Sequence, residues 1–125
     1  MQNALLAGLG GFIGTMLRYL LNSSVHRFFH YPVFPYGVLI INLIGCFLIG
    51  LLSGLIETRE IFTFQTRVFI FIGILGGFTT FSAFGYDTFN LLRNDKMLFA
   101  FINIFAQVVG GLFLVWGGYV LSRII

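Results

Sequence analysis

The chain has 125 residues, of which 58% are hydrophobic and only 9% are charged, and its mean hydropathy is +1.00. Soluble domains carry about 25% charged residues, so this composition indicates an integral membrane protein and excludes an ordinary soluble domain. The formal net charge of +3 is also too small and too scattered along the sequence for a nucleic-acid-binding surface.

Uncharged apolar runs divide the sequence at residues 1–17, 38–56, 68–86 and 97–122. Each is close to the ~20 residues that an α-helix needs to cross the ~30 Å hydrocarbon core of a bilayer. We therefore predict one all-α integral membrane domain over residues 1–125, with transmembrane helices at about 3–27, 36–56, 65–92 and 97–123. We expect no cleavable signal peptide, because no basic segment precedes the first apolar run.

The third apolar run contains Gly76-Gly77-Phe78-Thr79-Thr80, which is poor material for the interior of a helix. Glycine costs about 1 kcal/mol relative to alanine in a helix, and threonine is restricted at χ1. We predict that the third helix is broken between Gly76 and Thr80, in the middle of the membrane. Backbone carbonyls freed in hydrocarbon must face protein, water or an ion, so the break indicates an ion site and a transport function.

The basic residues near the membrane surfaces are divided evenly between its two sides. One side receives Arg59, Arg67 and Arg123, and the other receives Arg27, Arg93 and Lys96. Orientation in the membrane depends on an asymmetry in lysine and arginine. We therefore predict that the chain inserts both ways and forms an antiparallel, dual-topology homodimer. One fixed orientation set by weaker signals is the alternative.

Glycines four residues apart, Gly10 with Gly14 and Gly50 with Gly54, allow helix backbones to approach closely in lipid. The sequence leaves open whether these pairs pack within the chain or against a partner.

Two inverted copies whose broken helices face each other would place the same freed carbonyls around one point on the two-fold axis. Two carbonyls from each chain give about four hard oxygen ligands. No carboxylate lies nearby, because Asp87 is on the following helical turns. We therefore predict a monovalent cation such as Na⁺ at the centre of the dimer, in a structural role.

Phe81 and Phe84 are three residues apart and share a helix face just after the break. One interpretation is that they are ordinary core aromatics. The other is that they line a narrow path, where the positive edges of the rings accept a small anion. Thr80 and Ser82 add hydroxyl donors beside them.

Uncharged amides lie at membrane depth in two runs: Asn42 in the second, and Asn103 with Gln107, four residues apart, in the fourth. Alone, each amide would form a hydrogen bond between helices, and such a bond contributes about 0.6 kcal/mol to helix association. Together they form a ladder of donors that can replace the water shell of an anion. Arg18, the basic residue well inside a span, is a functional candidate, and a snorkelling anchor or a partner for carbonyls is the alternative.

The sequence offers no support for catalysis. His26 and His30 have i,i+4 spacing, but they flank a loop at Pro32 and lack a third ligand, so we expect no metal site there. Cys46 is the single cysteine, which excludes an intrachain disulfide, and we interpret it as a small buried apolar residue.

The chain resembles the Fluc (CrcB) family of small bacterial fluoride channels over nearly its whole length. The resemblance is carried by Gly10–Gly14 followed by Arg18-Tyr19, by Pro35–Leu43 and by Gly73–Phe84. It implies an antiparallel homodimer in the bacterial inner membrane, with two fluoride pathways and a central Na⁺ held by the backbone carbonyls of Gly76 and Thr79. By the same resemblance, Phe81 and Phe84 correspond to paired pore phenylalanines, Asn42 to a pore asparagine, and Asn103 and Gln107 to a polar track on the fourth helix.

The sequence also departs from the family pattern. Val38 stands where the family usually has threonine, Ala83 and Gly85 replace a threonine and a serine, and Asp87 falls where glutamate is common. Gly111 and Val115 occupy positions where the polar track often continues with hydroxyls. The break and the phenylalanine pair are intact.

These features predict passive, selective export of fluoride, which lowers its concentration in the cytoplasm. A small multidrug exporter would also have four helices and dual topology, but it needs an acidic residue in the first span, and residues 3–27 contain none. The second alternative is an assembly subunit whose glycines only pack helices, which leaves the predicted break unexplained.

Overall fold

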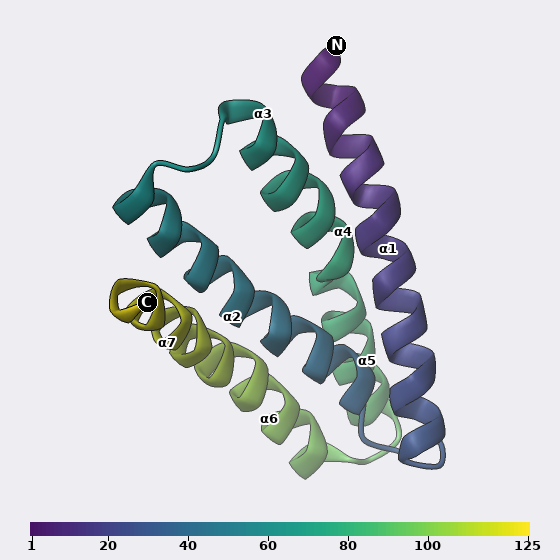
Figure 1. Cartoon of the computed structure of the whole chain (residues 1–125). Helices are drawn as coiled ribbons and strands as arrows, with labels where there is room; N and C mark the ends of the chain where they lie inside the picture. Colours follow the sequence, from purple (N-terminus) through teal and green to yellow (C-terminus); the bar gives the residue numbers. More distant parts are fainter.

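The computed structural model describes residues 1–125, and all of its regular elements are helical (Figure 1). The first two spans are single helices, α1 (Gln2–Phe28) and α2 (Tyr36–Arg59). The third span consists of α3 (Phe64–Arg67), the π-helix η1 (Val68–Leu75), α4 (Gly76–Phe78) and α5 (Phe81–Arg93). The fourth consists of α6 (Met97–Phe105), the π-helix η2 (Ala106–Gly110) and α7 (Gly111–Ile124).

All four spans are long and apolar enough to cross a membrane, which confirms the prediction of a multi-pass membrane protein. Only 20 of the 125 residues are buried, and large apolar side chains such as Phe12, Ile72 and Phe113 are exposed on different elements. A soluble monomer does not expose apolar surface on this scale. The outer faces of the helices are therefore suited to lipid or to another chain.

Glycines bring the helices together in two backbone-to-backbone contacts. α1 packs against η1 and α4, where a Cβ added at Gly14 would overlap the Ile74 carbonyl and one at Gly77 would lie 2.6 Å from the Gly11 carbonyl oxygen. α2 packs against α7, where a Cβ at Gly50 would overlap the Val115 carbonyl. The glycine pairs in α1 and α2 therefore pack against helices of the same chain and not against a partner.

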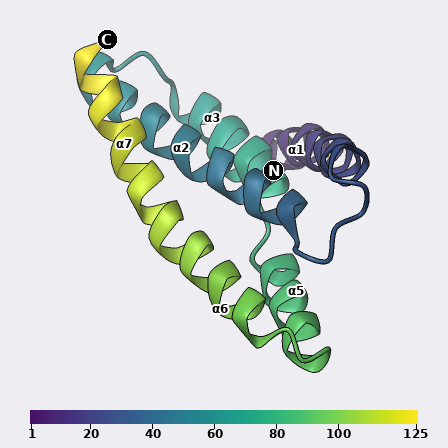
Figure 2. The ribbon, with the colours of Figure 1, turned by 90° about the horizontal axis from the view of Figure 1, so that it is seen from below.

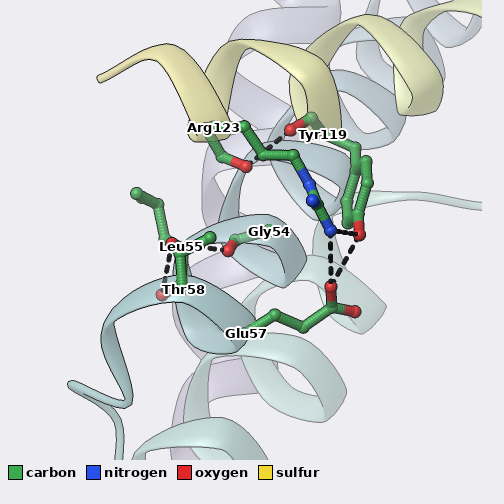
Figure 3. A network of polar contacts seen from close by, with 7 residues as sticks. Gly54, Leu55, Glu57, Thr58, Tyr119 and Arg123 are labelled. Atoms are coloured by element: carbon green, nitrogen blue, oxygen red, sulfur yellow. Dashed lines mark hydrogen bonds and ion pairs between the residues drawn. The ribbon is translucent and has the colours of Figure 1, made fainter.

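The ends of α2 and α7 are joined by a polar cluster (Figure 3). The Tyr119 hydroxyl donates to Glu57 Oε2 at 2.6 Å, and the Arg123 guanidinium lies 3.6 Å from the same carboxylate oxygen. Arg123 also donates to the Tyr119 hydroxyl and lies over its ring. This exposed cluster links the last turns of α2 and α7.

The third span is broken, as predicted, but the break is confined to the last two residues of the predicted segment Gly76–Thr80. Thr79 (φ −85°, ψ 158°) and Thr80 (φ −152°, ψ 119°) are extended, whereas Gly76 is helical (φ −62°, ψ −38°). In Figure 2 the ribbon narrows to a thread between the teal helix and the green α5. The expectation that the glycines belong to the break was wrong, because Gly77 is needed in the helix for the close contact with α1.

Candidate functional site

A cavity of about 370 Å³ lies beside the break, between α2, the third span and η2. Its wall contains no charged side chain. The lining residues are Asn42, Gly45, Cys46, Ile49, Phe71, Leu75, Gly76, Thr79, Thr80, Phe81, Phe84, Gln107 and Val108. Seven positions that the sequence singled out therefore meet in one place: Asn42, Gly76, Thr79, Thr80, Phe81, Phe84 and Gln107.

Asn42 braces the broken helix. Its Oδ1 accepts the Thr80 backbone N–H at 2.9 Å, and its Nδ2 donates to the Thr80 carbonyl at 3.0 Å and to Gln107 Oε1 at 2.9 Å. The carboxamide thus satisfies both backbone groups of a residue that has left the helix. Because unpaired backbone groups are costly at membrane depth, this contact explains how the break persists.

At least two backbone carbonyls at the break, those of Gly76 and Thr79, lose their helical donors. In a continuous helix the Gly76 carbonyl would accept from the Thr80 N–H, which instead donates to Asn42. The Thr79 carbonyl would accept from the Ala83 N–H, which instead donates to the Thr80 hydroxyl oxygen at 3.3 Å and so caps α5. These are the carbonyls that the resemblance assigns to a cation, and their hard oxygens suit a small monovalent ion.

The two phenylalanines stand at the start of α5. Their ring centroids are 5.6 Å apart and the rings are tilted by 57°. Phe84 is half-buried, whereas the Phe81 ring is 83% exposed and projects from the protein. The Ser82 hydroxyl does not line the cavity, but it lies 3.2 Å from the Thr80 hydroxyl oxygen.

The amides of the fourth span divide between two positions. Gln107, in η2, lines the cavity, and its Nε2 donates to Asn103 Oδ1 at 3.4 Å. Asn103, in α6, is fully buried and does not reach the cavity; its Nδ2 donates to the Thr88 hydroxyl oxygen at 3.0 Å. π-Helical turns inside α-helices are frequent at functional sites, and η2 places Gln107 at the cavity wall.

Several other sequence positions lie away from the cavity. Arg18 is half-buried on α1 and does not line the cavity. Asp87 lies in a separate pocket, together with Asn90 and Lys96. Gly111 and Val115 lie against α2: a Cβ at Gly111 would come within 3.2 Å of the Cys46 sulfur, and the Val115 backbone touches Gly50.

Sequence reasoning missed one residue at the cavity, Cys46, and one behind it, Thr88. Thr88 was not singled out, although a hydroxyl one turn after Phe84 on a membrane helix is a signal that could have identified it. Cys46 was interpreted as simply buried, but it is half-buried and lines the cavity. Both residues are small, and their position depends on which helix lies opposite.

The fold and the site define a small multi-pass membrane protein with an uncharged, hydrogen-bonding cavity at a broken helix. Residues 5–119 match the family described as "CrcB-like protein, Camphor Resistance (CrcB)". Curated relatives cover almost the whole chain. "Fluoride-specific ion channel FluC 1" of Methanosarcina acetivorans is 42% identical over 94% of this chain and 88% of the relative. "Fluoride-specific ion channel FluC" of Chloroflexus aurantiacus is 45% identical over 98% of this chain and 97% of the relative. The chain belongs to the CrcB family.

Proposed function

We propose that the protein is a fluoride-selective channel that exports fluoride passively across the inner membrane of a bacterium and so lowers the cytoplasmic concentration. The printed names of the relatives support the choice of ion. The observation that carries the proposal is the cavity itself, which offers amide and hydroxyl groups and aromatic rings without any charged side chain. Donors of this kind can replace the water shell of an anion, and no carboxylate is present to attract cations.

The fluoride pathway runs past Phe81, Phe84, Thr80, Ser82, Asn42 and Gln107, and Asn103 supports it from behind. Phe81 and Phe84 form a tilted pair, and the positive edges of such rings suit a small anion. The hydroxyls of Thr80 and Ser82 stand at the N-terminus of α5, where the helix dipole also favours negative charge. Arg18 lies outside this path and supports the pore from α1.

The working unit is an antiparallel homodimer. An exposed Phe81 ring and an exposed Gly76 backbone leave the site open on one side, so a second copy is needed to enclose it. The even division of basic residues across the membrane supports two opposite orientations. The structural Na⁺ of this dimer would be held by the Gly76 and Thr79 carbonyls of both copies, whose oxygens have lost their helical donors.

Fluoride efflux from liposomes that contain the purified protein tests the channel function. We expect rapid loss of fluoride and retention of chloride. Phe81→Ile should abolish fluoride loss, whereas Phe89→Ile, which changes an exposed phenylalanine of the same helix outside the cavity, should retain it. Retention of fluoride at the level of protein-free liposomes would reject the channel and favour an assembly subunit. Efflux that requires a proton gradient would favour an exporter.

Labelling in intact spheroplasts tests the dimer's orientation. A cysteine at the exposed C-terminal Ile125, in a Cys46→Ser background, is treated with a membrane-impermeant maleimide. We expect about half of the copies to react before lysis and all of them afterwards, because equal flanking charge gives both orientations. Labelling of nearly all or nearly none before lysis would reject dual topology without affecting the efflux result.

A further inference from the structure

One continuous chain of side-chain hydrogen bonds connects the broken helix to α5 through α2 and the fourth span. Its five bonds run from Thr80 N–H to Asn42 Oδ1 (2.9 Å), Asn42 Nδ2 to Gln107 Oε1 (2.9 Å), Gln107 Nε2 to Asn103 Oδ1 (3.4 Å), Asn103 Nδ2 to Thr88 Oγ1 (3.0 Å), and Thr88 Oγ1 to the Phe84 carbonyl (2.8 Å). All five donors point the same way along the chain.

The two ends of this chain admit only one direction. A backbone N–H can only donate, so the Thr80 end requires the oxygen of Asn42. A carbonyl can only accept, so the Thr88 hydroxyl donates its one hydrogen to the Phe84 carbonyl. It can then only accept a hydrogen bond from Asn103. The three amides between these ends therefore have a fixed orientation, and each bond polarises the next.

This orientation separates the roles of the two amides at the cavity. Both N–H bonds of Asn42 are committed, one to the Thr80 carbonyl and one to Gln107. Gln107 commits one N–H to Asn103 and keeps the other, and its side chain lines the cavity. A carboxamide has two N–H donors, so the free amide donor at the cavity belongs to Gln107 and not to Asn42.

We propose that Gln107 supplies the amide N–H that contacts fluoride, and that Thr88 is a positioning residue that holds Gln107 in this orientation through the buried Asn103. This inference rests on the proposed fluoride pathway. Asn103 is fully buried, so without the Thr88 hydroxyl its Nδ2 group has neither water nor a protein acceptor. The amide must then turn to find one, and Gln107 loses the partner that holds its Nε2 group in place at the cavity wall.

Matched substitutions at Thr88 test the proposal in the liposome efflux assay. Thr88→Val keeps the shape and removes the hydroxyl, whereas Thr88→Ser keeps the hydroxyl and removes the methyl group. We expect a fall of about tenfold in fluoride efflux for Thr88→Val and less than about twofold for Thr88→Ser, since one hydrogen bond to a charged group is at stake. If Thr88→Val does not fold, Thr88→Ala, which also lacks the hydroxyl, takes its place.

Two further measurements distinguish positioning from packing. In a Gln107→Leu background, Thr88→Val should cause no additional loss, because the group that it positions is absent. Selective ¹⁵N-glutamine labelling gives NMR signals for the side chains of Gln2, Gln65 and Gln107. Fluoride should shift the Gln107 signal in the unmodified protein and in Thr88→Ser, whereas chloride should not. In Thr88→Val, fluoride should leave this signal unchanged.

The outcomes are decisive in both directions. Efflux at the unmodified rate in Thr88→Val, equal losses in the Val and Ser variants, or an additive loss in the Gln107→Leu background would overturn the positioning role. An unmoved Gln107 signal in a protein that conducts fluoride would overturn the donor role. If the unmodified protein releases no fluoride, or if Phe81→Ile leaves efflux intact, the proposed pathway fails first, and the two failures are therefore distinguishable.

Discussion

Replacing Asn42 with leucine should remove the brace of the third span while keeping a side chain of similar size. The change deletes three hydrogen bonds and leaves both the N–H and the carbonyl of Thr80 without their side-chain partner. Interhelical hydrogen bonds in membranes average about 0.6 kcal/mol, so the bonds alone give about 2 kcal/mol. Each buried polar group left unpaired costs about 1–3 kcal/mol, so the two Thr80 groups together cost about 2–6 kcal/mol. This cost already contains the lost bonds, and we therefore expect a total loss of about 2–6 kcal/mol.

Equilibrium unfolding in mixed detergent micelles measures this loss as a change in the free energy of unfolding. Asn90→Leu is the matched control, because Asn90 is half-buried in the same protein but makes no side-chain hydrogen bond, and its Oδ1 is buried without a partner. The control should cost less than about 1 kcal/mol or stabilise the protein, since removing an unsatisfied polar group is favourable. Equal losses in the two variants would show that Asn42 does not brace the break.

Three other predictions concern packing, access and charge. Gly14→Ala should destabilise the protein strongly in a thermal melt, because the new Cβ would overlap the Ile74 carbonyl. The control Gly117→Ala, whose new Cβ meets open space, should stabilise the protein by up to about 1 kcal/mol. Equal melting temperatures for the two variants would contradict the close contact at Gly14. A small methanethiosulfonate reagent should slow fluoride efflux by modifying Cys46 at the cavity wall, and Cys46→Ser should remove the effect; inhibition that survives this change would place the reaction elsewhere. Glu57→Gln should cost less than about 1 kcal/mol in unfolding experiments, because the Glu57 and Arg123 side chains are both 56% exposed, and a larger loss would mean that the cluster carries more than a surface ion pair.

The sequence predicted the parts of the site whose chemistry is unusual in a membrane. An amide or a pair of hydroxyls in an apolar run must find partners in the same bundle, so Asn42, Gln107 and Thr80 could be expected to meet. The structure brings them to one cavity together with Phe81 and Phe84. Their contact with an ion and the antiparallel dimer stay predictions, because both depend on groups outside a single chain.

The position of the break could not be predicted from residue types. Gly76-Gly77 and Thr79-Thr80 are both weak helix formers, and intrinsic propensity does not choose between them. Tertiary contacts decide, since Gly77 lies against the Gly11 backbone in α1 and Thr80 lies beside the Asn42 amide in α2. A glycine that looks like a break can therefore be a packing site, and only the facing helix distinguishes the two.

The break has a chemical polarity that connects the two proposed ion sites. The helical stretch that ends at Phe78 leaves carbonyl oxygens at its C-terminal end, where the helix dipole is negative, and α5 begins with N–H groups and hydroxyls, where the dipole is positive. A cation is thus favoured on the Gly76 side and an anion on the Phe81 side, within the same few residues. Because Asn42 pairs with both backbone groups of Thr80, it separates the two ends without adding charge. A continuous helix would cancel both sites at once, so cation binding and anion passage in this protein should be lost together when the brace is removed.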